Sequence, residues 1–202
     1  MRGTLFIISA PSGGGKTTLV AALLQKLSNV KVSVSHTTRA PRVGEVDGVN
    51  YFFVSDEQFG NYQKANHFLE SAQVFNHYYG TSKEWVLSQL DSGCDVILEI
   101  DWQGAMRVKA QMDCVSVFIL PPSKEALFAR LQTRNQDSKE VITSRMAKAS
   151  SEVSHFKDYD YVVINDSFEN ALDDLITIFK AQRLKMTSQK QRYEKLLASF
   201  NE

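Results

Sequence analysis

Near the amino terminus the chain reads TLFIISAPSGGGKTTLVAALL, and its central segment, SAPSGGGKTT, gathers three successive glycines, a lysine and two threonines. Glycine costs conformational entropy wherever it is ordered, so three together need a reason. A loop without Cβ atoms can turn its backbone N–H groups towards phosphate oxygens, and the helix that follows adds a favourable dipole. Lys16 would then reach the β- and γ-phosphates of a nucleotide, and the Thr17 hydroxyl would help to hold Mg²⁺.

The flanks of this loop agree with a phosphate-binding function. Thr4 to Ser9 is an apolar run typical of a buried strand, and apolar residues recur at helical spacing after Lys16. The common pattern GxxxxGK[ST] has glycine where this chain has Ala10, and alanine is tolerated there if its backbone keeps negative φ. The residues predicted to bind the nucleotide phosphates in this loop are Ala10, Pro11, Ser12, Gly13, Gly14, Gly15, Lys16, Thr17 and Thr18.

A second cationic site is predicted in the segment SHTTRAPRVGEVDGVNY. Arg39 and Arg42 flank a proline, which removes a backbone donor and pushes the residue before it towards an extended conformation, so a loop holds the pair. Two guanidinium groups held in this way suit a second phosphate, and Tyr51 and Tyr79 could donate hydroxyls to the same oxygens. Two loop arginines are usually surface charges, so this prediction depends on the glycine-rich loop.

The elements that must position these residues alternate along the chain. Strand-like runs occur at residues 4–9, 32–35, 95–100, 115–120 and 161–165, and helical patterns such as 83–90 and 124–132 separate most of them. This alternation predicts an α/β fold in which helices cover both faces of a parallel sheet.

Two interruptions of the alternation are predicted to be separate parts. Residues 35–82 are aromatic, polar and alternating, which favours a small mixed insert. Residues 130–150 carry arginines around a polar stretch, which is typical of a lid: Arg130, Arg134 and Arg145. The predicted core consists of residues 1–34, 83–129 and 151–202.

Composition limits the classes of function. Lys+Arg and Asp+Glu both number 23 in 202 residues, so no overall field draws the chain to nucleic acid or to a membrane. Cys94 and Cys114 lie in or beside apolar runs without CxxC spacing, which indicates reduced thiols rather than metal ligands. The sequence holds no signal peptide and no run of about 18 apolar residues. We therefore expect a soluble, cytoplasmic protein.

The chain resembles the guanylate kinase family in six segments, SAPSGGGKTTL, SHTTRAPRVGEVDGVNYFFV, FLESAQVFNHYYGTS, VILEIDWQGA, FILPPS and RLQTRNQDS, which follow one another over nearly the whole chain. The resemblance implies an enzyme of purine metabolism that moves the γ-phosphoryl group of ATP to GMP, and to dGMP, with Mg²⁺. It also implies the family's fold, a P-loop parallel sheet flanked by helices, with a small mixed GMP-binding insert and a helical lid.

Position by position, the resemblance implies roles for individual residues. Lys16 and Thr17 would contact ATP and the metal ion, and Asn165 would lie beside the adenine. Arg130, Arg134 and Arg145 would cover the phosphates in transit. The implied GMP-binding residues are Ser35, Arg39, Arg42, Tyr51, Glu70, Tyr79, Thr81, Glu99 and Asp101. The residues expected to take part in catalysis are Lys16, Arg39, Arg42, Arg134 and Arg145, with no covalent nucleophile.

Three residues depart from the family pattern. Besides Ala10, Gly14 stands where alanine is commoner, and Asn135 stands where glycine is commoner after the lid arginine. Asparagine tolerates a left-handed backbone, so we expect the lid geometry to survive that replacement.

The carboxylates have roles that chemistry supports independently. Guanine presents the N1–H and an exocyclic amine side by side, two donors that one ionised carboxylate such as Glu70 can accept together. Glu99 and Asp101 follow an apolar run two residues apart, so strand alternation would place both on one face at the strand's carboxyl end. Ligands bind at that edge of open α/β sheets. These two acids could orient nucleotide hydroxyls, the base or a hydrated metal, and the sequence does not choose among these roles.

Other classes of protein share some of these features. The segment DWQG fits the DxxG of GTPase switches, with Thr37 and Thr38 as candidate switch threonines, but neither NKxD nor TKxD occurs to read guanine. Guanylate-kinase-like domains also serve as non-catalytic binding modules, which typically lose the ATP loop that this chain keeps. A kinase with another base specificity is disfavoured mainly by Glu70.

The segment from Lys180 onward predicts a basic, mostly helical tail. Its apolar residues are Leu184, Tyr193, Leu196, Leu197 and Phe200. They could dock on the chain's own core or on another subunit, so the composition leaves a homo-oligomer open.

Overall fold

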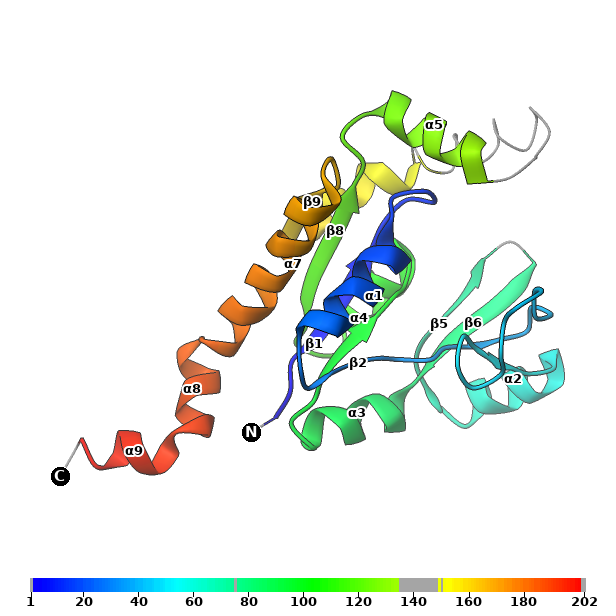
Figure 1. Ribbon diagram of the computed structural model, residues 1–202. Coiled ribbons are helices and arrows are strands. Elements are labelled where there is room, and N and C mark those ends of the chain that lie inside the picture. Colours follow the sequence, from blue (N-terminus) through cyan, green and yellow to red (C-terminus); the bar gives the residue numbers. More distant parts are fainter. Residues whose placement is uncertain (1, 75, 135–148, 150, 201–202) are drawn as a thin grey trace.

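Two sheets organise the protein in the computed structural model, which describes residues 2–74, 76–134, 149 and 151–200 (Figure 1). A five-stranded sheet has the strand order β2-β7-β1-β8-β9, and each neighbouring pair in it is parallel. A four-stranded sheet has the order β4-β3-β6-β5 and mixes parallel and antiparallel pairs.

The strands of the parallel sheet are short and largely apolar. They are β1 (Leu5–Ser9), β2 (Val30–Val32), β7 (Asp95–Leu98), β8 (Val115–Leu120) and β9 (Tyr161–Ile164). Every residue of the central strand β1 is buried, as expected for a strand that is covered on both faces.

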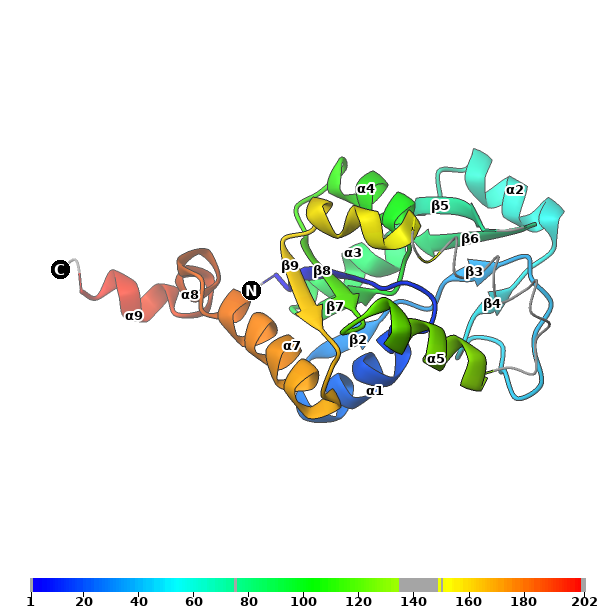
Figure 2. The same cartoon turned by 90° about the horizontal axis from the view of Figure 1, so that it is seen from above.

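Helices cover both faces of this sheet (Figure 2). On one face lie α1 (Lys16–Lys26) and α7 (Phe168–Arg183), and on the other lie α3 (Lys83–Asp91) and α4 (Trp102–Lys109). This arrangement confirms the predicted parallel sheet flanked by helices.

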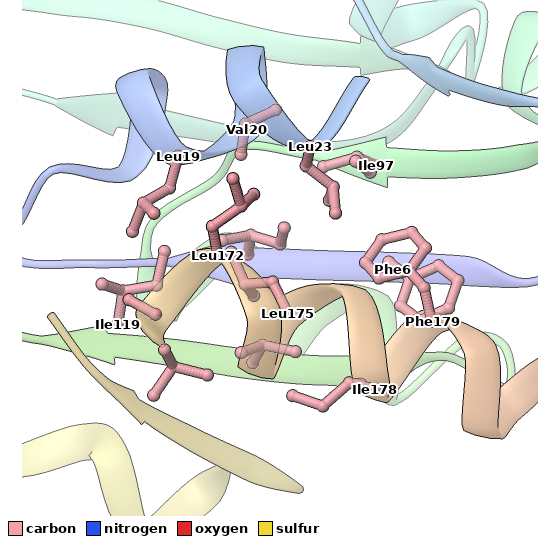
Figure 3. Close-up of a cluster of buried hydrophobic side chains, with 14 of the residues drawn as sticks. Phe6, Leu19, Val20, Leu23, Ile97, Ile119, Leu172, Leu175, Ile178 and Phe179 are labelled. Carbon is pink, nitrogen blue, oxygen red and sulfur yellow. The ribbon is translucent and has the colours of Figure 1, made fainter. Parts of the chain in front are cut away.

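The period of two along β1 divides the core into two clusters. Phe6 and Ile8 face α1 and α7, and the rings of Phe6 and Phe179 stack with centroids 3.6 Å apart (Figure 3). Leu5 and Ile7 face α3 and α4 instead. Because apolar side chains pack closely on both faces, the sheet forms a rigid base for the loops at its edge.

The second sheet is made from residues within the predicted insert. Its elements are β3 (His36–Thr37), β4 (Phe52–Phe53), α2 (Asp56–Lys64), β5 (Phe68–Val74) and β6 (His77–Ser82). Between β5 and β6 the register shifts from Phe68 to Glu70, so Leu69 is the extra residue of a β-bulge.

The remaining helical elements follow β8 and β9. They are α5 (Lys124–Arg134), the 3₁₀ helix η1 (Ser154–Asp158), α8 (Met186–Arg192) and α9 (Glu194–Ala198). The helical tail that the sequence predicts is present, and α8 and α9 extend away from the parallel sheet (Figure 1). Leu184, Leu196 and Phe200 are exposed on it. Among the described residues, no helix has the length and apolar character needed to cross a membrane.

Two predicted strand boundaries are wrong. β2 covers Val30–Val32 rather than residues 32–35, because its partner β7 ends at Leu98 and the chain then leaves this sheet for the insert. β7 stops short of residue 100 because Asp101 is already the N-cap of α4.

Candidate active site

The glycine-rich loop joins β1 to α1 at the carboxyl edge of the parallel sheet. Gly13 and Gly15 have φ angles of 86° and 91°, which side chains disfavour. A Cβ atom on Gly15 would also lie 2.3 Å from Nδ2 of Asn165. Among the described residues no side chain caps α1, and its first turn holds no acidic residue, so its N-terminal dipole faces the loop uncompensated. These features suit an anion at the loop.

Ala10 fits this loop because of its neighbour. Among the described residues other than glycine, only Asn29 and Asn66 have positive φ, so Ala10 meets the backbone condition that the sequence set. A Cβ atom on Gly14 would lie 3.0 Å from the Cβ of Ala10 and 3.0 Å from the carbonyl oxygen of Pro11. A side chain at position 14 would therefore be crowded both by the Ala10 methyl group and by the backbone of Pro11. The two departures from the family pattern are therefore in contact with each other.

We predict that Gly14→Ala alone destabilises the loop and raises the KM for ATP, because the added methyl overpacks a site where such strain costs about 1–3 kcal/mol. The double variant Ala10→Gly/Gly14→Ala should recover part of both losses, because it removes the contact with the Ala10 methyl group and keeps the contact with the Pro11 carbonyl oxygen. Thermal unfolding and the KM for ATP of the two single variants and the double variant measure the coupling. Additive effects would contradict compensation.

The loop lysine lies among carboxylates because β1 and β7 are neighbours that end at the same edge. Oγ1 of Thr17 donates to Oε2 of Glu99 at 3.4 Å. Burial lowers the pKa of the Lys16 ammonium, and the charges of Glu99 and Asp101 oppose that fall. Phosphate oxygens bound at this site would bring further negative charge close to Lys16. That charge would stabilise the protonated form of its half-buried side chain.

Asp101 reaches this site by a route that the sequence did not predict. The strand alternation expected to place it beside Glu99 ends at Leu98. Asp101 is instead the N-cap of α4, and its Oδ1 accepts a hydrogen bond from the Gly104 N–H at 2.9 Å. Glu99 and Asp101 both lie at this edge of the sheet, as predicted. For Asp101 the reason is the N-cap of α4, not the alternation of side chains along a strand.

A cavity of about 200 Å³ lies between the insert and the edge of the parallel sheet. Six predicted GMP-binding residues line it together: Ser35, Tyr51, Glu70, Tyr79, Glu99 and Asp101. A larger cavity of about 780 Å³ shares Ser35, Tyr51 and Glu99 with the first, and Lys16, Thr17 and Arg42 also line it. The predicted base pocket and the predicted phosphate loop therefore adjoin.

The carboxyl group of Glu70 is the most perturbed acid at the smaller cavity. Glu70 is only 6% exposed, and the Thr81 hydroxyl donates to its Oε1 at 2.7 Å. Burial raises the pKa of Glu70 to about 7, and the nearby charge of Asp101 adds to the rise while the hydrogen bond from Thr81 opposes it. A ligand with two adjacent N–H donors would favour the ionised form of this group.

Arg39 has a partner that the sequence reasoning missed. Its Nη2 lies 2.8 and 2.9 Å from the two carboxylate oxygens of Glu45, which also accepts from the Arg42 N–H at 2.7 Å. The hydrogen bond from Arg39 holds the pKa of Glu45 below its usual range. A carboxylate three residues after Arg42, in RVGE, is the signal that could have indicated this pairing. Glu45 therefore orients the guanidinium group of Arg39 and the backbone at Arg42.

Asn165 lies against the glycine-rich loop. Its Nδ2 donates to the carbonyl of Gly14 at 2.9 Å, and its side chain is buried. Nη2 of Arg130 donates to the Asn165 carbonyl at 2.9 Å, while Nη1 of Arg130 is buried without a hydrogen-bond partner in the described part of the chain. The position of Asn165 beside the adenine stays a prediction. Arg134 is the last residue of α5, and Arg145 and Asn135 lie outside the described residues.

The sequence and structure of this chain are similar to those of known guanylate kinases. A family sequence model described as "Guanylate kinase" matches residues 2–182. The guanylate kinase of Hahella chejuensis is 56% identical over 194 residues, which cover 96% of this chain and 93% of that protein. The guanylate kinase of Pseudoalteromonas translucida is 55% identical over 200 residues, covering 98% and 97%. The crystal structure of guanylate kinase from Anaplasma phagocytophilum matches with a TM-score of 0.77 and 34% identity, over 92% of this chain and 88% of that chain.

Proposed function

Since the chain belongs to the guanylate kinase family and transfers the γ-phosphoryl group of ATP to GMP, giving ADP and GDP, we propose a division of this work among its parts. The insert, residues 35–82, would hold GMP. The core would hold ATP at the glycine-rich loop, and residues 130–150 would close over the phosphates as a lid. The observation that carries this proposal is the adjacency of the cavity at Glu70 and the cavity at Lys16.

In the insert, we assign the base and the phosphate of GMP to different residues. The ionised Glu70 carboxylate would accept the guanine N1–H and exocyclic amine, with Thr81 holding one of its oxygens. The GMP phosphate would lie at Arg39 and Arg42. Glu45 stabilises the loop that carries these two residues through its hydrogen bonds to both of them. The Arg39 guanidinium, which Glu45 already holds, would lose less freedom when the phosphate binds.

In the core, Lys16 and the start of α1 would bind the β- and γ-phosphates of ATP. The GMP phosphate would be the attacking group, held in line with the γ-phosphorus. Phosphoryl transfer needs little covalent help from protein, so positioning and charge neutralisation by Lys16 and the arginines would supply most of the rate. Closure of the lid would exclude water, which competes with GMP as the acceptor.

The residues at the loop fit a magnesium ion. The Thr17 hydroxyl and the Glu99 carboxylate are oxygen donors 3.4 Å apart, and Mg²⁺ in kinases is usually held by one or two protein oxygens together with substrate phosphates. When bound, the ion would neutralise charge on the phosphates. We assign Thr17 as the residue that holds it. A cytoplasmic location and the use of dGMP are further expectations of this proposal.

One assay tests the assignment of the acceptor site. ATP turnover is measured with GMP, AMP, UMP and CMP as acceptors, and without acceptor to measure hydrolysis. We expect GMP to exceed each of the others in kcat/KM by at least about 100-fold, because a buried site built to pair with guanine donors leaves polar groups unpaired with the other bases. Comparable turnover with AMP would contradict a guanine-reading cavity.

We predict that the reaction depends on pH through Glu70. Its pKa in the free protein is about 7, so below that pH the carboxyl is protonated and can no longer accept both guanine donors. The kcat/KM for GMP should then fall by about tenfold for each pH unit below the pKa and reach a plateau above it. The GMP phosphate also titrates, and it does so with both proteins. Dividing the kcat/KM of the native protein by that of Glu70→Gln at each pH therefore removes its contribution. If this ratio of kcat/KM values is the same at pH values below and above the pKa of Glu70, the assignment is contradicted.

A further inference from the structure

Helix α4 and the turn after it contact β5 on both sides of Glu70. Nη1 of Arg107 donates to the carbonyl of Ser71, and Nε2 of Gln111 donates to the carbonyl of Leu69 at 2.9 Å. Gly104 and Arg107 lie three positions apart on one side of α4, and Gln111 follows in the turn after the helix. We call Gly104, Arg107 and Gln111 the α4 contact face.

Gly104 faces the carboxylate of Glu70 directly. A Cβ atom at this position would lie 2.9 Å from Oε2 of Glu70 and 3.3 Å from the Cβ of Ile100. The φ angle of Gly104 is not positive, so its backbone conformation does not require glycine. The Glu70 carboxylate is the group nearest to a side chain at this position, and such a side chain would have to displace it.

The contacts from Arg107 and Gln111 lie next to the bulge in β5. Leu69 is the extra residue, and bulges bend a strand and redirect the side chains next to them. The Leu69 carbonyl accepts its hydrogen bond from Gln111. The segment that carries Glu70 is thus held by α4 as well as by its partner strand.

The geometry points to the α4 contact face as the element that positions Glu70 for guanine, with Gly104 as a specificity-determining position. This inference rests on the proposed role of Glu70 as the base reader. Ala105 and Val108 anchor α4 in the core cluster, and Asp101 caps its start. The core sheet therefore sets the distance between the base reader and the transferring phosphate, although Glu70 belongs to the insert.

The first test compares two helical glycines. A Cβ atom on Gly60, in α2, would meet nothing within 4 Å, so Gly60→Ala is the matched control for Gly104→Ala. We expect Gly104→Ala to raise the KM for GMP and to lower the ratio of GMP to AMP kcat/KM by about tenfold or more, with the KM for ATP within about twofold. Gly60→Ala should leave all three values unchanged.

The second test introduces Gly104→Ala into the Glu70→Ala variant. This variant lacks the carboxylate that the new methyl group would displace. There we expect the substitution to change the kcat/KM for GMP by less than about twofold, and to leave the melting temperature unchanged or raised. Equal losses in both backgrounds would overturn the inference, because Gly104 would then act on the fold and not through Glu70.

The outcomes separate this inference from the role of Glu70. If Glu70→Ala keeps the native ratio of GMP to AMP, Glu70 is not the base reader and both proposals fail. If Glu70→Ala loses the ratio while folded Gly104→Ala keeps it within about twofold, only the positioning role fails. Should Gly104→Ala not fold, Gln111→Met keeps the side-chain length and removes the donor to Leu69. A fall in the same ratio by about threefold or more would support positioning, and an unchanged ratio would overturn it.

Discussion

Replacing Lys16 with alanine is expected to lower kcat for ATP and GMP by about two to three orders of magnitude, which is the usual loss when one group that stabilises transition-state charge is removed. Its ammonium lies where the loop, Glu99 and Asp101 meet, and burial already lowers its pKa. In the proposed mechanism, Lys16 would gain an interaction with the charge that develops on the transferring phosphoryl group, and it would gain this interaction only during the reaction. The KM values should change much less than kcat.

The control for this experiment lies in the same helix. Lys26 is exposed in the last turn of α1, so Lys26→Ala changes net charge equally without touching the loop. Lys16→Met tests whether the aliphatic stem matters apart from the charge. Steady-state kinetics and thermal unfolding are measured for all three. A folded Lys16→Ala protein with kcat within about tenfold of the native value would refute the assignment of the loop.

Glu70→Gln is expected to lower the kcat/KM for GMP by about tenfold to a thousandfold, because each charge-assisted hydrogen bond to guanine is worth roughly 1.5–3 kcal/mol. An amide offers one acceptor and one donor, so it can satisfy only one of the two guanine donors. AMP should gain relative to GMP, since its N1 acceptor could meet the new amide donor. The KM for ATP should stay unchanged because we assign ATP to the adjoining site.

Stability distinguishes this loss from misfolding. The folded pKa of Glu70 is raised from 4.5 to about 7, so ionising this carboxyl costs folding stability increasingly as pH rises through that interval, and the cost remains above it. A neutral glutamine removes that cost, so Glu70→Gln should melt no lower than the native protein at pH 8. Glu57→Gln, at an exposed position in α2, is the matched control. A ratio of GMP to AMP kcat/KM within about twofold of native would exclude Glu70 as the base reader.

The sequence alone was sufficient for features that depend on near neighbours in the chain. A loop that needs left-handed backbone must use glycine, and Gly13 and Gly15 have that conformation. A strand buried on both faces must be mainly apolar, and β1 is apolar from Leu5 to Ile8 before it ends at the buried Ser9. The family pattern in turn named residues that the structure collects around one cavity. Each of these signals is local, or is carried by residues whose chemistry has few substitutes.

The tertiary structure decided what depends on distant partners. Asn165 bonds to Gly14 across 151 positions, and Thr17 bonds to Glu99 across 82. The pairing of β2 with β7 sets the end of β2, and the cap of α4 rather than a pleat places Asp101. The approach of Gly104 to Glu70 follows from packing α4 against a bulged strand. No periodicity within a short window encodes these distances, because they arise only when the strand order brings separate segments to the same edge of the sheet.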